Sequence, residues 1–107
     1  MINRLAQLEA LLAEDPNDVF VVYAIALEHY KLGSAQKSIA LLKDLIAQHE
    51  SYVPAYFNLG QWLSELDSLD EARNYLEAGI NQAKTQNDTK AIQEMRELIL
   101  FIEDYEY

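Results

Sequence analysis

The sequence predicts an all-α fold: an array of antiparallel helix pairs with about six helices and a C-terminal capping helix. Three observations favour this fold. Only three glycines and two prolines occur in 107 residues, whereas the helix-favouring residues Ala, Leu, Glu, Gln and Lys are common. Apolar residues recur at helical spacing between short breaks. The chain also matches itself when it is shifted by 34 residues, which is typical of a repeat array.

The expected helices cover residues 2–14, 18–32, 35–48, 52–66, 69–84 and 88–104. Pro16 follows the first helix and indicates its end, because proline cannot continue a helix. The break between the second and third helices falls at Gly33-Ser34, where glycine suits the end of a helix.

The later helices carry similar boundary signals. Pro54 falls in the first turn of the fourth helix, where proline is tolerated. Ser68 and Glu71 have the spacing of a capping box at the start of the fifth helix. The last helix has an apolar stripe, and we expect it to cover the open end of the core. Its stripe consists of Ala91, Met95, Leu98, Ile99 and Ile102.

Residues 19–52 and 53–86 form two copies of one unit. Six positions are identical, and the apolar positions coincide as well: Val22, Ile25, Leu42 and Ile46 fall on Tyr56, Leu59, Leu76 and Ile80. Ala26 falls on Gly60, and small residues here predict a close approach of two helices. We therefore expect a single domain over 1–107. It comprises a half-repeat helix (1–16), repeat one (19–52), repeat two (53–86), and a capping helix with its tail (87–107).

This pattern resembles the tetratricopeptide repeat, which places an aromatic residue, a Leu-Gly pair and a small Ala at fixed spacing. The second copy carries these residues as Tyr56, Leu59, Gly60 and Ala72, and the first copy is a degraded version. The family's closing proline is replaced by Glu50 in one copy and by Lys84 in the other. The resemblance implies a right-handed superhelix whose concave face binds a partner protein.

In the family, the first helix of each repeat lines the concave face. Transferring those places to this sequence gives a groove of Phe20, Tyr23, Leu27, Tyr30, Phe57, Gln61 and Met95. Aromatic residues on an exposed face indicate protein binding. The alternative is that neighbouring helices cover these aromatic side chains. The lysines with which some family members hold a terminal carboxylate are missing here. We therefore expect an apolar peptide segment with Lys or Arg flanks.

Charge and composition exclude several classes of partner and site. Eighteen acidic residues oppose eight basic ones, for a net charge of −10, and the basic residues are scattered singly. Nucleic acid and anionic membrane are therefore poor partners. The absence of cysteine removes thiolate chemistry. The longest apolar run is far shorter than the roughly 20 residues of a membrane span. We expect a soluble, cytoplasmic protein.

No residue pattern indicates catalysis. The imidazoles are His29, expected in the core, and His49, expected on the surface at a helix end. Their spacing does not match a zinc motif. The acidic pairs fall at predicted helix ends and turns, where carboxylates commonly cap helices. We therefore expect no catalytic residues, no metal site and no cofactor.

Two functions fit this sequence. The first is a protein–protein interaction module that uses the aromatic groove. The alternative is a structural domain that forms a homodimer through its terminal helices, because the first helix has an open edge carrying Leu5, Leu8 and Leu12.

Overall fold

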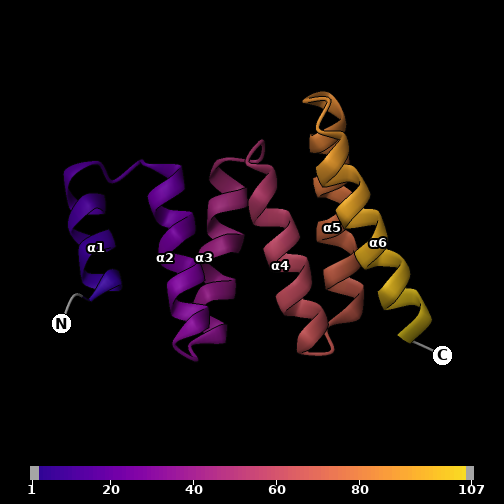
Figure 1. Cartoon of the computed structure of the whole chain (residues 1–107), viewed down its shortest axis with the longest axis horizontal. Coiled ribbons are helices and arrows are strands. Elements are labelled where there is room, and N and C mark those ends of the chain that lie inside the picture. Colours follow the sequence, from indigo (N-terminus) through magenta and orange to yellow (C-terminus); the bar gives the residue numbers. More distant parts are fainter. Residues whose placement is uncertain (1–2, 106–107) are drawn as a thin grey trace. The chain divides into compact units, whose positions relative to one another are not determined.

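The computed structural model describes residues 3–105, which form six α-helices (Figure 1). In chain order they are α1 (Arg4–Glu14), α2 (Val19–Lys31), α3 (Ala35–Gln48), α4 (Val53–Glu65), α5 (Leu69–Thr85) and α6 (Thr89–Tyr105). The predicted start of the first helix at residue 2 and the end of the predicted tail at 106–107 lie outside the described residues. Two compact units are present, one ending at His49 and the other beginning at Glu50. Within each unit, successive helices run antiparallel.

The 34-residue offset of the sequence reappears in the helix boundaries. The first helices of the two copies start at Val19 and Val53, and the second helices start at Ala35 and Leu69. Both pairs of starting residues are 34 positions apart. The second copy differs at its end, because α5 runs on to Thr85 whereas α3 stops at Gln48.

The turns after α2, α4 and α5 close in the same way. Gly33, Asp67 and Asn87 each lie one position beyond the C-cap and adopt positive φ angles of 90°, 61° and 56°. The next residue donates its backbone N–H to a carbonyl in the last turn of the helix. These bonds are Ser34 to His29 (2.8 Å), Ser68 to Leu63 (2.9 Å) and Asp88 to Ala83 (2.9 Å). The pattern is the Schellman motif, which satisfies carbonyl groups at a helix end.

The N-terminal caps only partly follow the predictions. The side chains of Asn3, Asp18 and Asp88 accept hydrogen bonds from the backbone N–H three residues later, at 3.2, 3.2 and 3.1 Å. Ser68 occupies the N-cap of α5, but its side chain makes no capping hydrogen bond, so the predicted capping box is wrong. Pro54 lies in the first turn of α4, as predicted.

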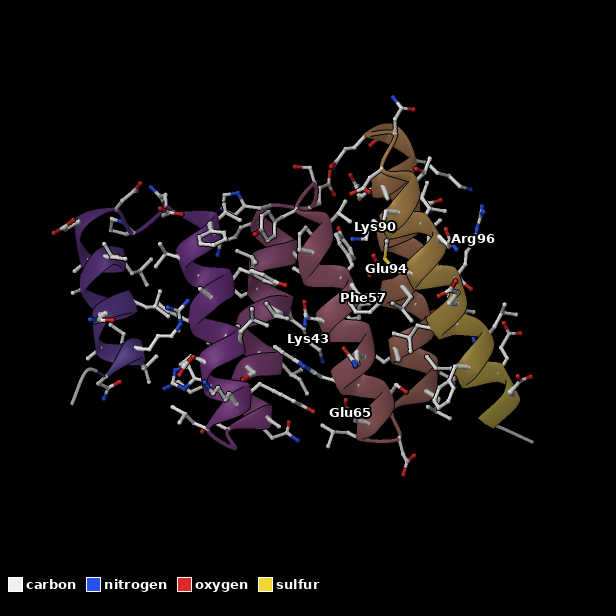
Figure 2. The ribbon with its side chains drawn as sticks, viewed as in Figure 1. Lys43, Phe57, Glu65, Lys90, Glu94 and Arg96 are labelled. Carbon is white, nitrogen blue, oxygen red and sulfur yellow. The ribbon has the colours of Figure 1, made fainter. Side chains whose placement is uncertain are left out.

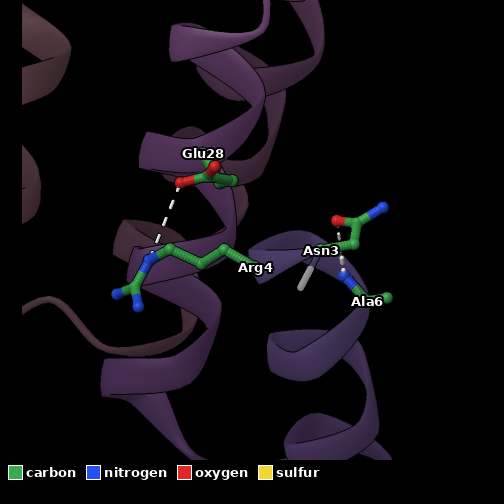
Figure 3. A network of polar contacts seen from close by, with 4 residues as sticks. All are labelled: Asn3, Arg4, Ala6 and Glu28. Carbon is green, nitrogen blue, oxygen red and sulfur yellow. Dashed lines mark hydrogen bonds and ion pairs between the residues drawn. The ribbon is translucent and has the colours of Figure 1, made fainter. Parts of the chain in front are cut away.

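In the first unit, α1 packs on α2 through an apolar cluster. Leu8 of α1 is buried with Val21, Ala24 and Ile25 of α2, and Leu5 and Leu12 pack against this cluster. The leucines that the sequence suggested as an open edge are therefore used inside the unit. An ion pair joins the same two helices, with Arg4 Nε 3.7 Å from a carboxylate oxygen of Glu28 (Figure 3).

In the second unit, two glycines allow close helix packing. A Cβ atom on Gly60 would lie 2.5 Å from Cγ of Leu76, so α4 and α5 meet closely there. The expected close approach at Gly60 is therefore present. A Cβ atom on Gly79 of α5 would lie 2.5 Å from Cβ of Tyr56 and 2.7 Å from Sδ of Met95. The core around these contacts includes fully buried Leu59, Leu76, Met95 and Ile102.

Tyr56 links this core to the chain before α4. Its hydroxyl donates a 2.6 Å hydrogen bond to the carbonyl oxygen of Glu50, while the ring is buried. Burial raises the pKa of the Tyr56 hydroxyl, and the charges of Glu50 and Tyr75 raise it further. The folded state therefore favours the neutral phenol.

We expect Tyr56→Phe to lower the free energy of unfolding by about 0.5–1.5 kcal/mol at pH 7, because the hydrogen bond is lost. The raised pKa contributes stability below the ordinary tyrosine pKa of about 10, and this contribution disappears as pH rises through the folded-state pKa. Urea unfolding at pH 7 and above pH 10 should show a steeper alkaline loss in wild type than in Tyr56→Phe. Parallel alkaline losses would contradict the assignment, because the other tyrosines are common to both proteins.

Candidate functional site

One face of α2 carries large apolar side chains that lie outside the core. It consists of Phe20, Tyr23, Leu27 and Tyr30, spaced so that all four lie on one side of the helix. Phe20 is 65 % exposed, and the other three are half-buried. The opposite side of α2 fills the core of the first unit. We call this surface the α2 face.

The corresponding surface of α4 lies in the second unit. Phe57 and Gln61 occupy the places of Tyr23 and Leu27, 34 residues later. Phe57 is half-buried and Gln61 is exposed, and Figure 2 shows Phe57 on α4. We call Phe57, Gln61, Ser64 and Glu65 the α4 face. It is more polar than the α2 face.

Met95 does not belong to either face, and its prediction as a groove residue needs correction. The side chain is fully buried and packs beside Gly79. The reason is the register of α6. This helix starts at Thr89, 36 residues after the start of α4 at Val53, so Met95 takes the core place that Leu59 has in α4.

Other residues of α6 are oriented towards α4. Figure 2 shows Lys90 and Glu94 projecting from the α4 side of α6 and Arg96 projecting from the opposite side. Lys90 is exposed and Glu94 is half-buried. At the same 36-residue spacing, Phe101 in α6 has the place that Glu65 has in α4. Phe101 was not among the groove residues that the sequence predicted, and the structure places it at the surface.

Phe101 shares a hollow with the C-terminal end of α4. Ser64, Glu65, Asp67 and Phe101 line this hollow, which has a volume of about 190 Å³. Phe101 is 61 % exposed, and Glu65 and Asp67 are exposed as well. We call it the α4–α6 hollow. Its lining combines one aromatic ring with two carboxylates.

The described residues contain little else that suggests chemistry. Within residues 3–105, no group of three His, Asp or Glu side chains is placed to hold a metal ion. His29 is buried and His49 is half-buried at the end of α3, where it borders a separate hollow of about 210 Å³ with Asp44. None of the helices in this part of the chain is long and apolar enough to cross a membrane.

The paired helices, their 34-residue offset and their exposed apolar faces define a helical-repeat protein. Solved structures show to which family of repeat proteins it belongs. A crystal structure of a tetratricopeptide repeat domain protein from Salinibacter ruber is 32% identical, with a TM-score of 0.78, and the match covers 82% of this chain and 98% of that one. A solution structure of a tetratricopeptide repeat domain protein from the same organism is 34% identical, with a TM-score of 0.82, over 86% and 93% of the two chains. The chain belongs to the tetratricopeptide repeat family.

A third structure has the same fold at lower identity. The solution structure of a protein from Bordetella parapertussis is 18% identical, with a TM-score of 0.84, and the match covers 98% of this chain and 91% of that one. No protein-family model and no curated protein matches the chain.

Proposed function

We propose that this chain is a protein–protein interaction module that binds a peptide segment of its partner and catalyses no reaction. Tetratricopeptide repeats generally mediate protein–protein interactions. The observation that carries the proposal is the α2 face, where four large apolar side chains lie outside the core and Phe20 is 65 % exposed. Aromatic side chains of this kind dominate the energetics of protein interfaces.

The proposed partner segment is apolar and has lysine or arginine flanks. Each unit offers its own contact for apolar side chains: the α2 face in the first unit and Phe57 of the α4 face in the second. The flanks are favoured by the net charge of −10. The same charge opposes nucleic acid and anionic lipid, whose phosphates are also negative.

A peptide array can test this proposal. The array presents apolar segments with Lys/Arg flanks, neutral flanks or Asp/Glu flanks to the purified chain. We expect binding to be strongest for the basic flanks and to decrease as salt rises. Binding by the basic-flanked peptides should fall at least tenfold in Tyr23→Glu and in Phe57→Glu, because truncating or charging an interface anchor commonly costs 2 kcal/mol or more.

Leu32→Glu is the matched control. Leu32 is 62 % exposed at the end of α2 and does not belong to the α2 face, so this variant should bind like wild type. Circular dichroism must first show that each variant keeps its helix content. Unchanged binding in both face variants, or a preference for acidic flanks, would contradict the proposed function.

Self-association through the terminal helices is the alternative function. Leu11 of α1 and Leu100 of α6 are 50 % and 62 % exposed, and these are the apolar groups that favour it. Light scattering at micromolar and higher concentrations separates the two candidates. A monomer at all concentrations supports the interaction module, whereas a stable dimer that is lost in Leu100→Glu supports self-association.

A further inference from the structure

We draw no further inference here: the strongest candidate, the face of α6 on which Ile92, Arg96 and Leu100 line a hollow of about 420 Å³, belongs to the self-association surface already described, and nothing in the structure shows what covers it.

Discussion

Leu76→Ala is expected to lower the free energy of unfolding of the second unit by about 2–5 kcal/mol. Leu76 is fully buried in α5, and removing its branched end leaves a cavity beside Gly60. Each kcal/mol should lower the melting temperature by roughly 4–8 °C in a domain of this size. Urea unfolding followed by circular dichroism measures the loss.

A double-mutant cycle with Gly60→Ala tests whether these two residues meet as the structure shows. Gly60→Ala alone should cost about 1–3 kcal/mol, because its Cβ atom would lie 2.5 Å from Cγ and Cδ2 of Leu76. In the Leu76→Ala background those side-chain atoms are gone, so the same glycine substitution should cost much less. Additive losses would show that α4 and α5 do not pack through this pair.

Met95→Ala has the second large expected effect. Met95 is fully buried against Gly79, so the variant should lose about 2–5 kcal/mol of stability. Leu100→Ala is the matched control, because it removes a comparable apolar side chain from the same helix at a position that is 62 % exposed. We expect the control to change stability by less than about 0.5 kcal/mol.

The same pair of variants separates a core residue from a binding residue. If Met95→Ala keeps wild-type stability but weakens peptide binding, Met95 is a groove residue, and its burial in the structure is wrong. If both variants are equally destabilised, α6 packs on a different face from the one described. Chemical denaturation and peptide binding should therefore be measured on the same samples.

The helices were predictable because their signals are local. The repeat was predictable because its two copies can be compared within the chain. Helical spacing of apolar residues, Gly33 after α2 and Pro54 in the first turn of α4 are properties of a few neighbouring positions. The turns at Asp67 and Asn87 were less visible, because residues other than glycine rarely adopt positive φ angles. The turn at Asp67 followed instead from the comparison of the two copies, because Asp67 falls on Gly33.

The side chains that lie outside the core were predictable only where a second copy existed. The α2 residues Tyr23 and Leu27 correspond to Phe57 and Gln61 of α4, and the structure leaves all four outside the core. α6 starts 36 residues after α4 rather than 34, so the repeat offset does not predict its register. In this register the side chain of Met95 lies in the core and that of Phe101 lies at the surface.

The sequence by itself determined the all-α class, the six helices, the pairing of helices at a 34-residue offset and the resemblance to the tetratricopeptide repeat family. These features depend on spacing and on internal comparison within the chain. Only the tertiary structure decided the rotation of α6 about its own axis. That rotation depends on contacts between residues far apart in the chain, such as Met95 with Gly79 and Phe101 with the end of α4. Packing of this kind has no short-range signal, and it decided that Met95 is buried and Phe101 is exposed.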